Sequence, residues 1–393
     1  MPSKKIIIDT DPGIDDILGL LLALSAKAEE VEILLISLTF GNIEVRSCLR
    51  NVISMFHIIE REMLWRRQQG RPEGFETLRA CPPIVAVGAE DPLEDQKMLG
   101  DYFRTFGLMH HPHLTPKETW EHMFDPSADP SIIQPVPTGD TSSPSALAHR
   151  TFIPSKRRAH EEILRVLREN DPDTVTLVAV GPLTNLALAS AADPETFLRV
   201  KEVVVMGGTV NKPGNVTPVA EFNAYADAFA AARVYALTSP SPKSTMPPGT
   251  SLPAYPDKLS RPLTLRQFPL NITMRHGMTR GQFREAVAAS LEGGSPLAEW
   301  VSAFIAHTFR TIERLHQGHA GDDVDLSLHD PVCVWYAMTA DDPRVAAISD
   351  VPGGYSNRDH RGSGRGAGNR IWRMDGSPAE KDFGATLLRR VFG

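Results

Sequence analysis

Four aspartates between residues 9 and 16 are the side chains with the clearest chemistry. Asp9, Asp11, Asp15 and Asp16 fall within the eight residues DTDPGIDD. Carboxylates crowded in this way repel one another, and each tends to hold a proton. A hard divalent cation removes the repulsion, because Ca²⁺ and Mg²⁺ prefer carboxylate and carbonyl oxygens. The spacing therefore predicts a cation site; a solvated acidic turn in which Asp15 caps a helix is the simpler alternative.

The residues around this acidic loop predict how it is held. Ile6, Ile7 and Ile8 form a β-branched run that is typical of a buried parallel strand. Pro12-Gly13 then breaks the chain, and apolar residues at helical spacing follow over residues 14–24. The partial charge of roughly +0.5 at a helix N-terminus cannot balance four acids. A cation is therefore still needed to neutralise the carboxylates of the loop.

Strand and helix signals alternate through much of the chain. Residues 31–39 predict a second buried strand, and the turn Phe40-Gly41-Asn42 after it can present Asn42 beside the acidic loop. Further strands are predicted at 84–88, 174–180 and 203–206, and helices at 45–59, 159–168, 186–191, 224–235, 296–315 and 332–338. This alternation predicts the α/β class, with a Rossmann-like, mostly parallel β-sheet flanked by helices.

We expect residues 1–393 to form one domain that carries surface insertions. These insertions are expected near residues 60–83, 100–158 and 238–261, where the sequence is polar or rich in proline, and the Gly- and Arg-rich run 353–368 is expected to be flexible. His110, His111 and His113 in the second insertion resemble metal ligands. Pro112 splits them and no cysteine is near, which favours a loop.

Composition narrows the class of protein. Hydrophobic residues make up 41% of the chain and charged residues 23%, which is ordinary for a soluble protein. The net charge of −7 argues against a nucleic-acid partner. The three cysteines are widely spaced and indicate a reducing compartment. Without a secretory signal or an apolar run of ~18 residues, we expect a cytoplasmic protein with no membrane partner.

Five segments together resemble one known family. DTDPGIDD resembles the signature of the inosine/uridine-preferring nucleoside hydrolases, and the other segments follow in the family's order: TFGN at 39–42, VGPLTNLALA at 180–189, MGG…GNVTPVAEFN at 206–223 and HDP at 329–331. They span roughly residues 5 to 340. The long insertions are most similar to the fungal, uridine-hydrolase-like branch.

The resemblance implies a nucleoside hydrolase fold and Ca²⁺-dependent hydrolysis of the N-glycosidic bond of ribonucleosides, giving free base and ribose. Uridine, inosine or both are the implied substrates, and a homodimer or homotetramer is the implied assembly. Asp11, Asp16 and Asp330 would bind Ca²⁺ by their carboxylates and Val180 by its backbone carbonyl. Asp11 would also be the catalytic base, and His329 would sit beside the leaving base. The ribose hydroxyls would be bound by Asp15, Asn42, Asn215, Glu221 and Asn223.

The residue types suit this chemistry on their own account. Breaking an N-glycosidic bond builds positive charge on the sugar, and carboxylates such as Asp15 and Glu221 stabilise such charge. His329 is the type of side chain that titrates near neutrality and can serve a leaving base. Simpler readings exist: the asparagines could be turn residues, Glu221 a surface acid at a helix start, and His329 a helix cap.

Three segments depart from the family pattern. Residues 102–109 carry Arg104 where the family usually has histidine, residues 353–368 replace a Thr-Arg-Gly segment, and Asn271 stands where the family usually has aspartate. A degenerate member that binds nucleoside or ribose with little turnover therefore stays open. A haloacid-dehalogenase-like phosphatase also opens with Asp-x-Asp, but Pro12-Gly13 after Asp11 does not fit it.

Overall fold

The computed structural model describes residues 3–94, 96–100, 121–124, 151–246, 251–315, 320–341, 356–361, 368–378 and 380–393. Their strands form a mostly parallel nine-stranded sheet in the order β10-β11-β7-β6-β5-β1-β2-β3-β4, in which only β10 runs antiparallel to its neighbour. The fold-class prediction is confirmed.

The elements follow the alternation expected from the sequence. The strands of the sheet are β1 Lys4–Thr10, β2 Val31–Leu38, β3 Ile84–Val87, β4 Ile153–Pro154, β5 Val175–Ala179, β6 Glu202–Met206, β7 Leu265–Phe268, β10 Ser356–Arg361 and β11 Arg370–Gly376. A separate antiparallel pair is formed by β8 Gly277–Thr279 and β9 Asp325–Ser327.

Helices cover both faces of this sheet. They are α1 Ile14–Leu24, α2 Val45–Gln68, α3 Glu76–Ala80, α5 Ala159–Glu169, α6 Thr184–Ala192, α7 Pro194–Phe197, α8 Phe222–Ala226, α9 Ala228–Ala236, α10 Leu270–Thr273, α11 Arg280–Glu292, α12 Pro296–Leu315, α13 His329–Thr339 and α15 Phe383–Phe392. Short 3₁₀ helices lie at Glu121–Phe124, Pro242–Thr245, Gly321–Asp323 and Glu380–Asp382. In the described ranges no helix is both long and apolar enough to span a bilayer.

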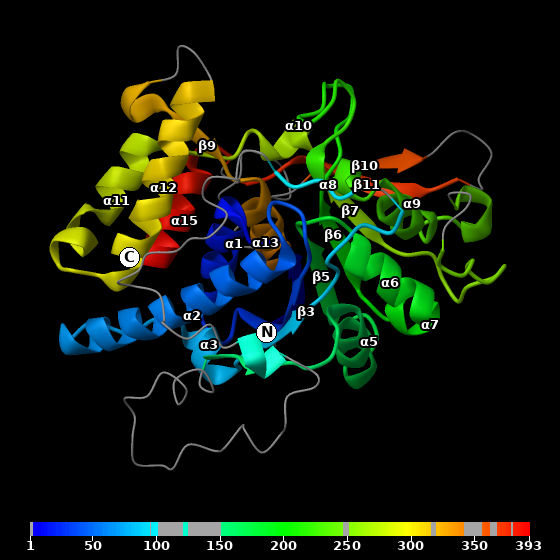
Figure 1. The fold of residues 1–393 in the computed structure, drawn as a ribbon, viewed down its shortest axis with the longest axis horizontal. Coiled ribbons are helices and arrows are strands. Elements are labelled where there is room, and N and C mark those ends of the chain that lie inside the picture. Colours follow the sequence, from blue (N-terminus) through cyan, green and yellow to red (C-terminus); the bar gives the residue numbers. More distant parts are fainter. Residues whose placement is uncertain are drawn as a thin grey trace.

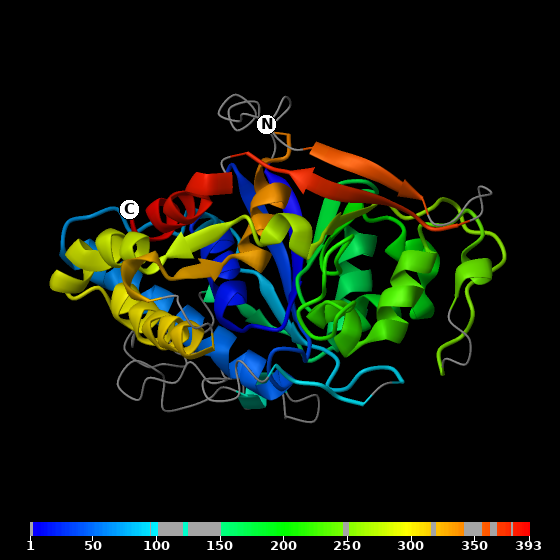
Figure 2. The same cartoon turned by 90° about the horizontal axis from the view of Figure 1, so that it is seen from above.

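Strand β1 shows why two cores form. Its side chains alternate between the faces of the sheet: Ile6 and Ile8 join a core with α1, α2 and α13, whereas Ile7 joins a core with α5, α6 and α9. Figure 1 shows these two groups of helices on opposite sides of the sheet. Helix α11 packs against both α12 and α15, α15 also contacts α1, and the three helices α11, α12 and α15 lie together at the left of Figure 2.

Two helix predictions need correction. The helix that begins at Val45 continues past residue 59 to Gln68, because Glu62 and Arg66 are buried there and bond to each other at 2.7 Å. The single helix expected over 224–235 is split into α8 and α9 at Asp227. The side chain of Asp227 caps α9 by accepting from the amide of Ala230 at 2.8 Å.

Part of the Gly- and Arg-rich run, residues 356–361, forms strand β10, which the sequence did not predict; the expected flexibility of the run stays a prediction. This strand pairs with β11 over six Cα partners, from Ser356 to Arg361. Its sequence, SNRDHR, contains no apolar residue, so hydrophobic periodicity does not predict a strand there. Residues 101–120 and 125–150 lie outside the described residues, and so does most of the rest of the 353–368 run. The first two of these ranges contain Arg104, His110, His111 and His113, whose expected roles therefore stay predictions.

Candidate active site

The candidate residues lie at the point in the sheet where the strand order reverses. The chain builds β2, β3 and β4 on one side of β1, and β5, β6 and β7 on the other. Ligands of open α/β sheets bind at the carboxyl ends of the strands at such a switch point. Asp11 follows β1, Val180 follows β5, and Asn42 comes four residues after β2 ends. The topology therefore brings together residues that are far apart in the sequence.

Asp11 is held between two glycines. Its Oδ2 accepts a hydrogen bond of 2.5 Å from the backbone amide of Asn42, while among the described atoms its buried Oδ1 has no hydrogen-bond partner. A methyl group added at Gly181 would lie 2.6 Å from that Oδ1, and one added at Gly41 would collide with Oδ2. A buried carboxylate oxygen without a donor costs free energy, so Oδ1 is suited to meet a cation or a donor from a substrate.

Three further carboxylates form a cluster at the start of α1 and α13. One oxygen each from Asp15, Asp16 and Asp330 lies within 4.8 Å of the other two. Asp16 also accepts from the hydroxyl of Thr10 at 2.6 Å and from the side-chain amide of Asn42 at 2.9 Å. The carboxylates expected to bind Ca²⁺ were those of Asp11, Asp16 and Asp330, so this cluster has Asp15 in the place of Asp11.

The acids of this site hold protons strongly. Burial raises the pKa of Asp11 well above its usual value, and the charge of Asp16 raises it further. Burial is also the largest cause that raises the pKa of Asp330 well above its usual value. The negative charges of Asp15, Asp16 and Asp11 raise this pKa further. The pKa of Asp15 rises to about 7 for the same two reasons. A hard divalent cation fits such a site, in which buried carboxylate oxygens repel one another.

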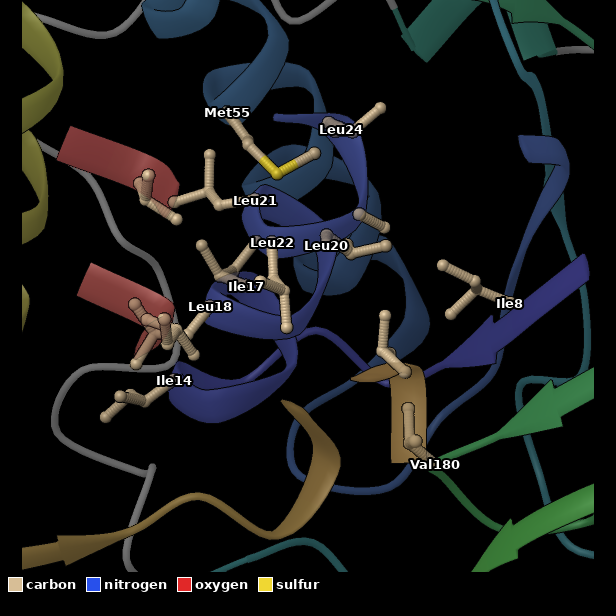
Figure 3. Close-up of a cluster of buried hydrophobic side chains, with 14 of the residues drawn as sticks. Ile8, Ile14, Ile17, Leu18, Leu20, Leu21, Leu22, Leu24, Met55 and Val180 are labelled. Carbon is tan, nitrogen blue, oxygen red and sulfur yellow. The ribbon is translucent and has the colours of Figure 1, made fainter. Parts of the chain in front are cut away.

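Val180 presents its backbone to the site and its side chain to the core. Its isopropyl group is buried in the core cluster that also contains Ile8 and the leucines of α1 (Figure 3). The carbonyl oxygen accepts from the side-chain amide of Asn223 at 2.7 Å. A carbonyl oxygen has two lone pairs, so this bond leaves one for a cation. Asn223 lies in α8, and its amide thus links the end of β5 to the segment after β6.

Glu221 is a buried helix cap rather than a surface acid. Its Oε2 accepts from the amides of Gly208 and Ala224 at 2.8 and 3.0 Å, and its Oε1 accepts from the amide of Asn223 at 2.8 Å. Burial raises the pKa of Glu221, while these three amides oppose the rise. Asn215 lies in the segment between β6 and α8 that also contains Glu221. Its side chain is exposed, and its Oδ1 accepts from the amide of Phe222 at 2.9 Å.

His329 begins α13, directly before Asp330. Its Nδ1 lies 2.8 Å from the hydroxyl of Thr273 in α10. Burial lowers the pKa of His329 to about 4, so the ring is neutral at neutral pH. The amide of Asp330 donates to Oδ2 of Asp15 at 3.4 Å, which joins the start of α13 to the acidic loop.

Several supporting contacts of the site were not predicted. Asp9, near the end of β1, is fully buried and accepts from Ser37 and from the side-chain amide of Asn185, the latter at 2.9 Å. Burial raises the pKa of Asp9 to about 7. Asn185 also donates to the carbonyl of Leu38 at 3.0 Å. The motifs that contain Asp9 and Asn185 were visible in the sequence, but their mutual contact was not.

Comparison with known proteins gives a consistent result. The sequence matches the model of the family described as inosine-uridine preferring nucleoside hydrolase over residues 6–365. An uncharacterized protein of Schizosaccharomyces pombe is 32% identical over 243 residues, which cover 62% of this chain and 60% of that protein. Uridine nucleosidase 1 of Arabidopsis thaliana is 31% identical over 235 residues, covering 59% of this chain and 53% of that protein. The match thus spans little more than half the length of these relatives.

Solved structures share the fold. A plant nucleoside hydrolase, the PpNRh1 enzyme, aligns over 100% of both chains with a TM-score of 0.63 and 19% identity. A purine-preferring ribonucleoside hydrolase from Gardnerella vaginalis aligns over 99% of this chain and 98% of its own, with a TM-score of 0.61 and 18% identity. With the family match over residues 6–365, these findings show that the chain belongs to the inosine-uridine preferring nucleoside hydrolase family.

Proposed function

We propose that this protein hydrolyses the N-glycosidic bond of ribonucleosides, with uridine or inosine as substrate, and that the reaction depends on Ca²⁺. The observation that carries the proposal is the convergence of Asp11, Asp15, Asp16 and Asp330 with the buried, unpartnered Oδ1 of Asp11 within the described residues. The relative from Arabidopsis thaliana is named a uridine nucleosidase. Relatives from Salmonella and Klebsiella are named non-specific and pyrimidine-specific ribonucleoside hydrolases.

The proposed calcium ligands are the carboxylates of Asp11, Asp16 and Asp330 and the carbonyl of Val180. Asp15 lies close enough to Asp16 and Asp330 to support the same cation. When bound, a divalent cation neutralises these carboxylates and makes a nearby water more acidic. Asp11 is then the base that accepts the proton of the attacking water, through the oxygen that has no other partner in the described structure.

The proposed ribose ligands are Asp15, Asn42, Asn215, Glu221 and Asn223. Negative charge on Asp15 and Glu221 stabilises the positive charge that develops on the sugar as the bond to the base breaks. The three amides that bond to Glu221 hold its carboxylate in one orientation. A carboxylate held in this way needs no reorganisation when charge develops, which favours the transition state over the ground state.

The proposed role of His329 concerns the leaving base. Thr273 occupies Nδ1, so Nε2 is the nitrogen that can face the base. Because burial lowers the pKa of His329 to about 4, the neutral ring acts as a hydrogen-bond donor to the base rather than as a charged acid. A homodimer or homotetramer, a cytoplasmic location and the lack of a nucleic-acid partner stay predictions from the sequence.

Base release measured by chromatography tests the proposal. Purified protein is incubated with uridine, cytidine, inosine, adenosine and guanosine, with Ca²⁺ or with a chelator. Asp11→Asn keeps the size of the side chain and should lower kcat by at least about 10²-fold, because the amide cannot accept the proton. Asp257→Asn is the matched control, since Asp257 is exposed and pairs with Lys243 on the surface.

Each outcome has a definite meaning. Release of base that is lost in Asp11→Asn and kept in Asp257→Asn supports the hydrolase, and the preferred nucleoside names its substrate. Loss on chelation that Ca²⁺ restores supports the cation. No release from any nucleoside, together with nucleoside binding by calorimetry, would instead support the alternative of a degenerate member that binds without turnover.

A further inference from the structure

The loop at residues 207–221 carries two of the proposed ribose ligands, Asn215 and Glu221. It leaves β6 at the carboxyl end of the sheet and returns to α8. Its two ends are joined by the bond from the amide of Gly208 to Glu221 at 2.8 Å. Gly208 has a φ of 78°, a left-handed conformation that favours glycine. The position of this loop therefore decides where both ligands stand.

Asn271 in α10 both donates a hydrogen bond to this loop and accepts one from it. Its Nδ2 donates to the carbonyl of Val210 at 2.6 Å, and its Oδ1 accepts from the amide of Val210 at 2.8 Å. The side chain thereby satisfies both backbone groups of one residue, as a neighbouring strand would. Such a pair needs a donor and an acceptor in one side chain, which an amide provides and an alkyl group does not.

Other contacts hold the two ends of the loop. At its carboxyl end the amide of Phe222 donates to Oδ1 of Asn215 at 2.9 Å, and the amide of Asn223 donates to Glu221 at 2.8 Å. Gln267 donates to the carbonyl of Gly207 at 3.1 Å, and the amide of Leu270 donates to the carbonyl of Gly208 at 3.0 Å. Val210 lies further along, next to Asn211, which has a φ of 58°. Asn271 therefore secures the loop beyond the glycines, where the chain turns towards Asn215.

We propose that Asn271 is a positioning residue for ribose binding, acting through Val210 on the 207–221 loop. This inference rests on the proposed function, because it takes Asn215 and Glu221 as ribose ligands. Asn271→Leu is the sharpest test: it keeps the approximate size of the side chain and removes both the donor and the acceptor that bind Val210. The loop should shift, and ribose should bind more weakly.

The experiment compares wild type, Asn271→Leu, Asn271→Ala and the control Asn170→Leu. Asn170 accepts from Lys5 at 2.8 Å and donates to the carbonyl of Val166 at 2.9 Å, so the control loses a comparable pair of bonds at the amino end of the sheet. KM and kcat are measured for uridine, inosine and 4-nitrophenyl riboside, and melting temperatures show that the variants fold. We expect KM to rise about ten-fold in Asn271→Leu and Asn271→Ala on all three ribosides, with kcat within a few-fold of wild type and the control unchanged.

Two results would overturn the proposal. An unchanged KM with a lowered melting temperature would make Asn271 a purely structural residue. A fall in kcat on nucleosides alone, with normal kinetics on 4-nitrophenyl riboside, would mean that α10 acts on the leaving base instead. This split is informative because the nitrophenyl group leaves without protonation, whereas all three substrates share the ribose.

Failure of the proposed function is read separately. If wild type releases no base, the hydrolase proposal fails, and the dissociation constant of uridine measured by calorimetry decides the role of Asn271. Weaker binding by Asn271→Leu than by Asn170→Leu then supports the positioning role, and equal binding overturns it. A wild-type protein that binds no nucleoside overturns both proposals.

Discussion

The hydroxyl group of Thr273 lies 2.8 Å from Nδ1 of His329 and links α10 to the first residue of α13. This contact sets the orientation of the imidazole ring. Replacing Thr273 by valine keeps the shape and removes the hydroxyl, so we expect kcat on nucleosides to fall roughly ten-fold. The rate on 4-nitrophenyl riboside should stay close to wild type, because that leaving group needs no hydrogen bond.

Thr308→Val is the control for this variant. Thr308 is buried in α12, and its hydroxyl donates to the carbonyl of Phe304 at 2.9 Å. Equal losses on both kinds of substrate, or an equal loss in the control, would rule out a specific role of Thr273 at the leaving group.

Gly181 leaves room for the carboxylate of Asp11. Because an added methyl group would lie 2.6 Å from Oδ1, Gly181→Ala should displace the carboxylate and lower kcat about 10²-fold. In Gly19→Ala the added methyl group would meet its nearest neighbour, Val334, at 3.4 Å, so that variant should retain activity. Steady-state kinetics of the two variants gives the comparison, and full activity of Gly181→Ala would disprove the packing argument.

Cation binding should couple to pH in a defined direction. The pKa of Asp15 is raised to about 7 from an unfolded value near 4, so the folded state binds more protons than the unfolded state between these values. Without a cation, stability should therefore fall as pH rises from about 4 to about 7. Ca²⁺ replaces the protons, so it should raise the melting temperature more at about pH 8 than at about pH 5.

Scanning calorimetry with Ca²⁺ or chelator at both pH values checks this coupling. In Asp330→Asn the shift caused by Ca²⁺ should shrink, because one proposed ligand has lost its charge. A Ca²⁺ shift that is equal at both pH values and unaffected by Asp330→Asn would argue against a carboxylate site.

His276 should make the protein sensitive to acid. It is fully buried between the carbonyl of Ile272 and the hydroxyl of Ser377, and burial lowers its pKa to about 4. Between about pH 6.5 and 4 the unfolded state therefore binds a proton that the folded state does not, and stability falls as pH falls. At 1.36 kcal/mol per pH unit, the loss amounts to about 3 kcal/mol.

Urea unfolding across this pH range measures the loss. His276→Gln removes the titrating group, so its free energy of unfolding should depend less steeply on pH than that of wild type, even if its value at neutral pH is lower. Identical slopes would show that other groups cause the acid sensitivity.

Periodicity and turn residues predicted much of the fold. The acidic loop, β1 and α1 lie where the run of isoleucines, Pro12-Gly13 and the spaced leucines indicated. Helix α12 also matches its predicted range of 296–315. The end of α2 was missed because Glu62, buried against Ser295 at 2.6 Å, looks like a surface residue when only the sequence is read.

The sequence named candidate site residues, and their arrangement in space comes from the fold alone. The motifs named Asp11, Asp16 and Asp330, but only the fold shows Asp15 grouped with Asp16 and Asp330. The contact of Thr273 with His329 joins residues 56 positions apart and has no local sequence signal. Contacts of this kind depend on how α10 and α13 pack, which local patterns do not encode.

The link between Asp15 and the amide of Asp330 also bears on how the protein is made. These two residues are 315 positions apart, and β1 lies at the centre of the sheet. During synthesis, the acidic loop leaves the ribosome long before α13 exists to complete it. Because domains fold as units once their distant parts are present, the acidic loop of the nascent chain stays incomplete until then, and its carboxylates tend to hold protons. Its carboxylates gain their full set of neighbours only when translation has passed residue 330, so cation loading is expected to be a late step of biogenesis.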